Sequence, residues 1–374
     1  MKEKEITISL CMIVRNEENT IARCLDSVKD ICDEIVIVDT GSTDHTKEIV
    51  KKYTDRIFDF TWIDDFAAAR NFAFSRATMD YTLWLDADDI LMTQDREKFL
   101  MFKKTIDPLV DAVSMPYHYA FDQFGKVSFS FRRNRMVKKD KNFRWVGAVH
   151  EYLEVSGNVL SSDICVTHKR MEGHSSDRNL KIFERRKEKG ESFTPRDLYY
   201  YGNELFDHKL YSRAIEIYQE FLETGQGWVE DKISACGKLA DCFRELGETE
   251  KQLEYIYKSF EYTSPRAEFC CRLGFHFLNA KRYEQGVFWY KLATQLEKPV
   301  DSSGFMTEAC WTWLPHLQLC VCYDRLGKHE LAYEHNEIAR KYRPENAQVL
   351  FNKKYLEGVL GIESPKKNEI GQEK

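Results

Sequence analysis

The sequence predicts an α/β domain with a mainly parallel sheet, followed by an all-α domain built from helical repeats. In the first half, short apolar runs alternate with segments whose apolar residues recur at helical spacing, a pattern typical of a parallel sheet with crossover helices. Several apolar runs end in a carboxylate, which places acidic side chains where open α/β sheets bind ligands. In the second half the alternation stops, and a weak repeat of paired helices follows.

The composition argues against several classes of protein. The chain has 374 residues, which favours two domains, and 43% of them are apolar, enough for ordinary cores. A formal net charge of -6 argues against nucleic-acid binding, which needs a basic surface. Because no apolar run approaches the roughly 18 residues that span a bilayer, we expect no transmembrane segment and a cytoplasmic protein. The 11 cysteines form no C-x-x-C pair, so we interpret them as reduced core thiols.

The first two strands are predicted from short apolar runs. Residues 6–14 form the first, and Asn16 is expected to cap a helix with an apolar stripe at helical spacing. That stripe consists of Ile21, Cys24, Leu25 and Val28. Residues 34–39 form the second strand, which ends in Asp39, and Asp44 is placed to cap the helix after it.

The next segments lead to a cluster of carboxylates. Residues 57–60 predict a third strand, residues 66–77 an alanine-rich helix, and residues 81–85 a fourth strand that runs directly into the sequence Asp-Ala-Asp-Asp. Because successive side chains of an extended segment point in opposite directions, Asp86 and Asp88 are expected to face one spot. Mg²⁺ is usually held by one or two such carboxylates together with water and phosphate oxygens. The alternative is a surface turn with solvated aspartates.

Four phrases in the same order carry a family resemblance. They are CMIVRNEENTIARCLDSV, EIVIVDTGSTDHT, AAARNFAF and LWLDADD. Together they resemble the family 2 glycosyltransferases, whose GT-A fold is a nucleotide-sugar-binding domain with a central, mainly parallel sheet. The G-x-G-x-x-G fingerprint of dinucleotide-binding domains is absent after the first strand.

The resemblance implies roles for particular residues. Glu17 and Asp39 look like contacts to the ribose and base of a nucleotide-sugar, and Arg70 like a contact to its diphosphate or base. Asp86 and Asp88 look like the D-x-D pair that bridges the diphosphate through Mg²⁺ or Mn²⁺. A divalent cation and a nearby guanidinium would stabilise negative charge on the departing oxygen.

Simpler interpretations of these residues remain open. Asp39 can be a turn residue beside Asp44, and Arg70 can be an exposed helix arginine that pairs with Asp64 or Asp65. We interpret Asp89 as a neighbour of the metal ligands rather than as a ligand.

A basic hairpin is predicted next. Residues 113–120 and 127–131 show the alternation of residue types that is typical of strands, and Gly125 and Lys126 lie between them. A basic cluster follows, and we expect most of it to form a solvated strand face, while one or two of its members are candidates to reach the diphosphate. The cluster consists of Arg132, Arg133, Arg135, Lys138, Lys139, Lys141 and Arg144.

The last candidate site residues come from two short phrases. In the family, an acidic residue at the place of Glu151 takes the proton from the acceptor, and inversion requires such a base opposite the leaving group. Glu151 is our first candidate and His150 the second, and the alternative is that this pair only orients loops. Similar enzymes complete the metal site with a histidine from the region of His168, although a core or capping histidine is equally compatible with the sequence.

The second half resembles tetratricopeptide repeats. Small residues recur in the first helices of the pairs, and prolines close three of the copies. The small residues are Gly202, Ala240, Gly274 and Cys320, and the prolines are Pro265, Pro299 and Pro344. We therefore predict a GT-A domain at residues 1–178, a charged helical linker at 179–197, repeats at 198–360 with an insertion near 301–307, and a disordered tail at 361–374. Stacked helix pairs suit peptide binding or a homodimer contact.

The two-domain order is similar to that of bacterial peptide S-glycosyltransferases of glycosylated bacteriocins. The resemblance implies a metal-dependent, inverting glycosyltransferase that uses a nucleotide-diphosphate sugar, expected to be a UDP-sugar, with Mg²⁺ or Mn²⁺ as cofactor. The acceptor can be a peptide, a protein or a cell-envelope glycan. The alternative is an inactive scaffold that binds a nucleotide-sugar and a protein partner.

Overall fold

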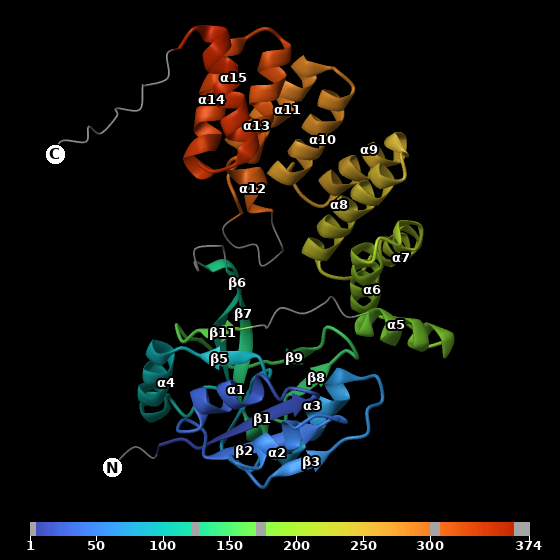
Figure 1. Ribbon diagram of the computed structural model, residues 1–374. Helices are drawn as coiled ribbons and strands as arrows, with labels where there is room; N and C mark the ends of the chain where they lie inside the picture. Colours follow the sequence, from blue (N-terminus) through green and yellow to red (C-terminus); the bar gives the residue numbers. More distant parts are fainter. Residues whose placement is uncertain (1–4, 122–126, 170–176, 300–306, 363–374) are drawn as a thin grey trace, which may run out of the picture. The chain divides into compact units, whose positions relative to one another are not determined.

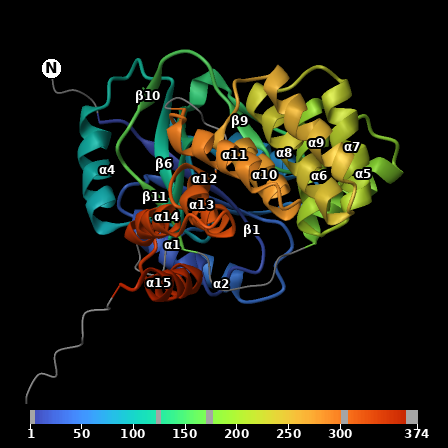
Figure 2. The same cartoon turned by 90° about the horizontal axis from the view of Figure 1, so that it is seen from above.

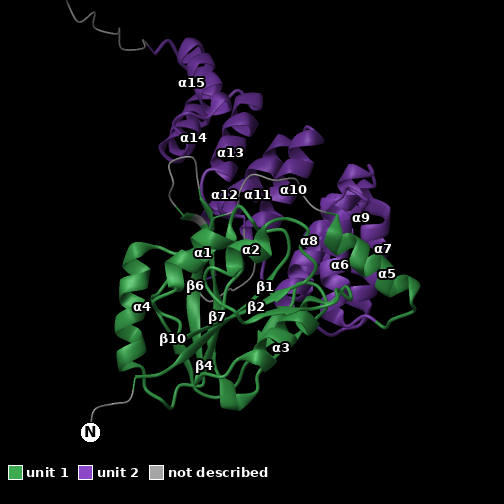
Figure 3. Ribbon diagram, turned by 60° about the horizontal axis from the view of Figure 1, so that its bottom comes forward, with its two compact units in different colours: residues 1–192 green, residues 193–374 purple. Residues whose placement is uncertain are grey.

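The computed structural model describes residues 5–121, 127–169, 177–299 and 307–362. The chain divides into two compact units, residues 1–192 and residues 193–374 (Figure 3). The predicted fold class is confirmed, because the first unit is α/β with a mainly parallel sheet and the second is all-α. No helix in the described ranges is both long and apolar enough to cross a membrane.

The first four strands of the α/β unit form the parallel part of its sheet, in the order β3-β2-β1-β4 (Figure 1). These strands are β1 (Ile8–Val14), β2 (Glu34–Asp39), β3 (Ile57–Asp59) and β4 (Tyr81–Trp84). The helices that connect them are α1 (Ile21–Val28), α2 (Thr46–Val50) and α3 (Phe66–Arg76). Every residue of β2 and β4 is buried, as expected for strands covered on both faces.

The predicted stripe of α1 is buried, but the helix begins later than expected. Asn16 is not its cap: it has a φ of +56°, and its side-chain oxygen accepts a hydrogen bond from the backbone of Thr43 in the turn after β2. The chain turns once more, through hydrogen bonds from the backbone of Thr20 and Ile21 to the Glu17 carbonyl, before the helix starts. Asn16 therefore ties two strand-end loops together instead of capping a helix.

The rest of the sheet is mixed. Strand β7 runs antiparallel to both β4 and β6, so it joins the parallel part to the far edge. Its remaining strands are β5 (Asp89–Leu91), β6 (Ala112–Phe121), β7 (Val127–Lys138), β10 (Val159–Ser161) and β11 (Val166–His168). Strands β8 (Arg144–Val146) and β9 (Tyr152–Glu154) pair with each other in a separate antiparallel sheet. The remaining helices of this unit are α4 (Thr93–Thr105) and α5 (Arg178–Glu188). The predicted hairpin corresponds to β6 and β7, and its turn at Gly125 and Lys126 lies outside the described residues.

An irregularity in the β6–β7 pairing positions one arginine. Val113 pairs with Met136 and the next residue, Ser114, pairs with Asn134, so Arg135 is an extra residue in β7. Such a bulge bends a strand and changes the direction of a side chain. Met136 therefore enters the apolar core, and Arg135 is free to point toward the end of β4.

The second unit consists of antiparallel helix pairs. Neighbouring helices from α6 to α9 lie side by side in two perpendicular views (Figures 1 and 2). The helices are α6 (Pro195–Asp207), α7 (Tyr211–Glu223), α8 (Val229–Glu245), α9 (Thr249–Lys258), α10 (Ala267–Asn279), α11 (Tyr283–Gln295), α12 (Glu308–Trp311), α13 (Leu314–Arg325), α14 (His329–Tyr342) and α15 (Ala347–Leu360). Most of the predicted insertion and tail lie outside the described residues.

The recurring small residues allow the paired helices to approach closely. A Cβ atom at Gly202 would lie 2.6 Å from the ring of Tyr218 in the following helix, and one at Gly274 would lie 2.7 Å from the ring of Tyr290. Real Cβ atoms do not approach so closely, so each glycine is required by the aromatic ring of its partner helix. This contact explains the small residue in the first and third copies of the repeat.

Candidate active site

The predicted donor-side residues gather at the carboxyl ends of the parallel strands. Glu17 follows β1, Asp39 ends β2, and Asp86 lies two residues beyond the end of β4. Strands β2, β1 and β4 are neighbours in the sheet and run parallel, so their ends share one edge. This edge is where open α/β sheets bind ligands.

Arg70 connects two carboxylates of the site. Its Nη2 donates to Oδ1 of Asp86 at 2.7 Å, and its Nε donates to Oε1 of Glu151 at 2.6 Å. The guanidinium carbon lies 4.9 Å from the ring centre of Trp84 and 4.7 Å from that of Trp145. Arg70 is only 7% exposed, so the interpretation of an exposed helix arginine is wrong.

The acidic neighbours of Arg70 have other partners. Asp65 caps α3 by accepting a hydrogen bond from the backbone of Ala68, and Asp64 pairs with Arg185 of α5. Burial alone would raise the pKa of Asp86, but the charges of Arg70 and Arg135 outweigh it and hold that pKa well below its usual value. Asp86 is therefore an anion at neutral pH.

Asp86 and Asp88 do not project to one side. The backbone N–H of Asp89 donates to the Asp86 carbonyl at 3.0 Å, so the chain turns directly after β4 instead of staying extended. As a result Asp86 reaches Arg70, whereas Asp88 faces His168, with 3.5 Å between its Oδ1 and the histidine Nδ1. The alternation argument fails here because it holds only along an extended strand.

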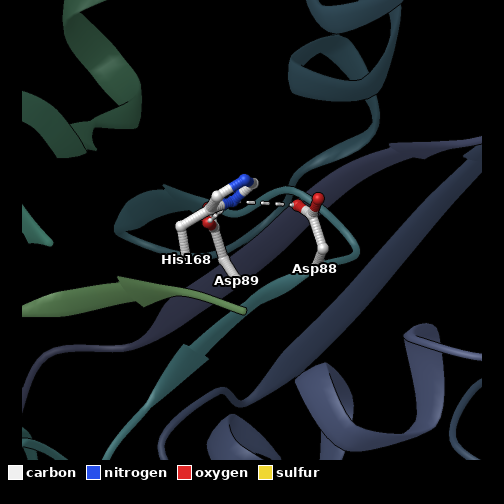
Figure 4. A group of neighbouring side chains, drawn as sticks. All are labelled: Asp88, Asp89 and His168. Carbon is white, nitrogen blue, oxygen red and sulfur yellow. Dashed lines mark ion pairs between the residues drawn. The ribbon is translucent and has the colours of Figure 1, made fainter. Parts of the chain in front are cut away.

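Asp88, Asp89 and His168 form a compact group that could hold a metal ion (Figure 4). Each contributes one ligand atom, and these atoms lie within 4.8 Å of one another. In the described part of the chain, no other group of three histidine, cysteine, aspartate or glutamate side chains meets this criterion, and Asp86 is not a member. The antiparallel pairing of β11 with β5, which sets His168 opposite Asp89, brings the group together. Carboxylate oxygens and an imidazole nitrogen suit Mn²⁺, and carboxylates suit Mg²⁺.

The carboxylate of Asp89 accepts hydrogen bonds from three groups. It is completely buried and accepts hydrogen bonds from Nη1 of Arg135 at 2.8 Å, from the hydroxyl of Tyr117 at 2.8 Å and from the backbone of Asp86 at 3.1 Å. The Tyr117 hydroxyl also lies 2.9 Å from Nδ1 of His168. Burial lowers the pKa of His168, but Asp88 and Asp89 more than compensate and raise it to about 9. Metal binding at this imidazole would therefore displace a proton.

One carboxylate oxygen of Asp39 accepts hydrogen bonds, and the other has no hydrogen-bond partner among the described residues. It is 2% exposed, and its Oδ2 accepts from the backbone of Gly41 and Ser42 at 3.1 and 3.0 Å. Its Oδ1 is buried and has no hydrogen-bond partner among the described residues. The turn interpretation is thus correct for one oxygen, while the other is a buried acceptor whose hydrogen-bonding capacity is unused among the described residues. Nearby, burial raises the pKa of Glu17, whose Oε2 accepts from the Thr20 hydroxyl at 2.5 Å.

A short loop after β8 places the side chain of Glu151 beside Arg70. Asn71 of α3 exchanges two hydrogen bonds, each of 2.9 Å, with the backbone of Trp145, which fixes β8 against the helix. His150 then adopts a φ of +53°, and the next side chain, that of Glu151, points at Arg70 and is 11% exposed. The structure therefore places Glu151 on the same guanidinium as Asp86.

Sequence reasoning missed the buried members of the basic cluster. The expectation of a solvated face is wrong for Arg135, which is completely buried against the ring of Trp84 at 4.0 Å. Strand alternation places Phe131, Arg133 and Arg135 on one face of β7, and this signal could have separated them from Arg132.

The family model for glycosyl transferase family 2 matches residues 9–154. The match spans β2, β3, β4 and all but the first residue of β1, together with Arg70, the three aspartates after β4 and Glu151. Within these residues the chain is similar to glycosyltransferase family 2. The GT-A domain expected from the four sequence phrases agrees with this assignment.

Several curated proteins are similar to part of this chain. The chain is 37% identical over 149 residues to a TPR repeat-containing protein of Synechococcus elongatus, covering 40% of this chain and 36% of that protein. It is 30% identical over 213 residues to the SPbeta prophage-derived glycosyltransferase SunS of Bacillus subtilis, covering 53% and 49%. It is 27% identical over 162 residues to the lipopolysaccharide core biosynthesis glycosyltransferase LpsC of Rhizobium meliloti, covering 41% and 60%. The match to each of these relatives spans less than two thirds of its length.

Proposed function

We propose that this chain is a metal-dependent, inverting glycosyltransferase that transfers a sugar from a UDP-sugar to a peptide, a protein or a cell-envelope glycan. The observation that carries the proposal is the position of Arg70 in the family 2 domain. Its guanidinium holds Asp86 on the donor side and Glu151 on the expected acceptor side, next to the group formed by Asp88, Asp89 and His168.

The donor binds at the strand ends. The unengaged Oδ1 of Asp39 accepts a hydrogen bond from the base or ribose, and Glu17 lies at the neighbouring strand end. Asp88 and His168 hold Mg²⁺ or Mn²⁺, with Asp86 or Asp89 as the further carboxylate. When bound, the cation stabilises the negative charge of the departing diphosphate.

Glu151 acts as the base. It accepts the proton from the acceptor while the acceptor attacks the anomeric carbon, on the face opposite the leaving diphosphate. Arg70, whose guanidinium also contacts the adjacent rings of Trp84 and Trp145, orients the carboxylate of Glu151, which is 11% exposed. His150 is the second candidate for this step.

Donor turnover tests the proposal. We expect the purified protein to release UDP from UDP-glucose or UDP-GlcNAc in the presence of Mn²⁺, and to lose this activity with EDTA or with Asp88→Ala. Absence of both hydrolysis and binding for every nucleotide-sugar tried would refute the enzymatic function and favour the inactive scaffold.

The base has its own test. We expect Glu151→Gln to lower sugar transfer by about 10²- to 10⁴-fold while UDP affinity is unchanged, because a general base acts in the chemical step and not in donor binding. His150→Gln is the matched variant. A larger loss of transfer in His150→Gln than in Glu151→Gln would reverse the two assignments.

We propose that the helical unit binds the acceptor or a second copy of the chain. We also propose that the protein acts in the cytoplasm. All 11 cysteines are free, in keeping with a reducing compartment.

An apolar stripe on α15 supports self-association: Phe351 is 70% exposed, and Tyr355 and Val359 are nearly half exposed. Light scattering should report a dimer that Phe351→Glu dissociates, and an intact-mass screen of cell lysate should identify the acceptor. A monomeric wild type would exclude the homodimer.

A further inference from the structure

Three arginines of β7 differ in how their charge is satisfied. Arg132 donates from Nη2 to the carbonyls of Ser114 and Ser162 at 2.6 and 2.7 Å. Arg135 forms the completely buried ion pair with Asp89. Both of these guanidiniums therefore have a partner within the protein.

Arg133 has no such partner. Within the described ranges, its guanidinium has neither a hydrogen-bond acceptor nor a carboxylate at ion-pair distance. Aromatic rings surround it instead, with centres at 5.3 Å for Phe131, 5.6 Å for Tyr117 and 5.7 Å for Trp84. Burial, followed by the charge of Arg135, lowers the pKa of Arg133, so its cation is held in an unfavourable environment.

The aromatic contacts offset only part of this unfavourable environment. A cation beside an aromatic ring is attracted by the ring, but such a contact is weaker than the charge-assisted hydrogen bond that Arg133 lacks. A cation held without a hydrogen-bonded partner in the free protein is suited to an anion that arrives later.

The surroundings of Arg133 indicate which anion this is. The ring of Trp84 contacts both Arg133 and Arg70, and Tyr117 contacts both Arg133 and His168. Asp86 is the carboxylate whose charge acts most strongly on Arg133, yet Asp86 is already bonded to Arg70. Arg133 thus shares one aromatic ring with Arg70 and another with His168 of the candidate metal group, two residues that the proposed function places beside the donor.

We propose that Arg133 binds the diphosphate of the sugar donor directly, an inference that rests on the proposed function. When the bond between the anomeric carbon and the β-phosphate oxygen breaks, the electron pair stays on the diphosphate, and the proton of the acceptor passes to Glu151. Arg133 donates hydrogen bonds to the departing anion. Its fork of N–H groups matches two phosphate oxygens, a geometry that lysine cannot reproduce.

Calorimetric titration of the whole chain with UDP, and with uridine as the probe that lacks phosphate, tests this role in the presence of Mn²⁺. We expect Arg133→Gln to weaken UDP binding by about 10- to 100-fold, the factor for one charge-assisted hydrogen-bonded contact, and to leave uridine binding unchanged. Arg133→Lys should recover part of the loss. The melting temperature of unliganded Arg133→Gln should match that of the wild type, because no hydrogen bond of the free protein is removed.

Arg132→Gln is the matched control, since it removes a neighbouring guanidinium whose partners are backbone carbonyls. We expect it to bind UDP like the wild type. Unchanged UDP affinity in Arg133→Gln would overturn the role of Arg133 alone, and so would an equal loss of UDP and uridine binding. A wild type that binds neither UDP nor any other nucleoside diphosphate would overturn the proposed function and, with it, this inference.

Discussion

The two units stabilise their interiors in different ways. The α/β unit concentrates buried charge at one sheet edge, where the completely buried pair of Arg135 and Asp89 lies beside the half-buried group around His168. The helical unit keeps the ion pair of Arg266 with Glu230 partly exposed, and two of its helix pairs have the same glycine–tyrosine contact. The candidate site thus depends on buried charges, and burying them costs free energy. The packing of the helix pairs depends on complementary shapes.

The largest expected effect comes from breaking the buried pair. Arg135→Met leaves the charge of Asp89 uncompensated, and we expect it to lower the free energy of unfolding by about 3–5 kcal/mol. Urea denaturation measures the loss, and hydrogen exchange should locate it in residues 5–169. Arg132→Met, on the same strand but bonded to carbonyls, is the control. Equal stability of the two variants would contradict the importance of the pair.

The helical unit should respond to shape instead. Gly202→Ala drives a methyl group into the Tyr218 ring, and we expect overpacking to cost about 1–3 kcal/mol. Gly358 of α15 is the matched site, because a Cβ atom there meets nothing within 4 Å. Gly358→Ala should therefore stabilise the unit by up to about 1 kcal/mol through helix propensity. If Gly202→Ala is also stabilising, the close contact does not limit this position.

The smallest effect is a pH dependence in the helical unit. The Nδ1 atoms of His316 and His335 lie 2.9 Å apart. The ring of Tyr323 stacks on His335, and the charge of Lys291 also acts on His335. Burial, then His335, lowers the pKa of His316 from 6.5 to about 4. The unfolded chain therefore binds more protons between these values, so this pair's contribution to stability is lost as pH falls from about 6.5 towards 4.

Thermal melting of the wild type and of His316→Gln at pH 7 and pH 5 measures this dependence. The wild type should lose stability between the two pH values, and the variant should lose less. A steeper loss in the variant would show that the pair does not resist protonation.

Much of the fold could be predicted because its signals are local. Continuous apolar runs that end in Asp39 and Asp86 fix the parallel strands and the edge where they meet, and the spacing of Gly202 and Gly274 fixes the helix pairs. The family phrases also indicated Arg70, whose two carboxylate contacts the structure then showed.

The remainder depends on geometry that a sequence does not display. One backbone hydrogen bond after β4 separates Asp86 from Asp88 and brings Asp89 into the group with His168. One extra residue in β7 turns Arg135 inward. Neither the turn nor the bulge has a glycine or proline to indicate it, so strand alternation could group Arg135 with Arg133 but could not show that Arg135 pairs with Asp89.

The shared guanidinium of Arg70 has a consequence for how this site can be altered. Asp86 and Glu151 are linked through one cation, so removing either carboxylate leaves Arg70 to the other. Substitutions at the two positions should therefore be non-additive, although the residues are far apart in the sequence and belong to different loops. In the proposed mechanism, a change of donor specificity at Asp86 is therefore constrained by the proton transfer proposed for Glu151.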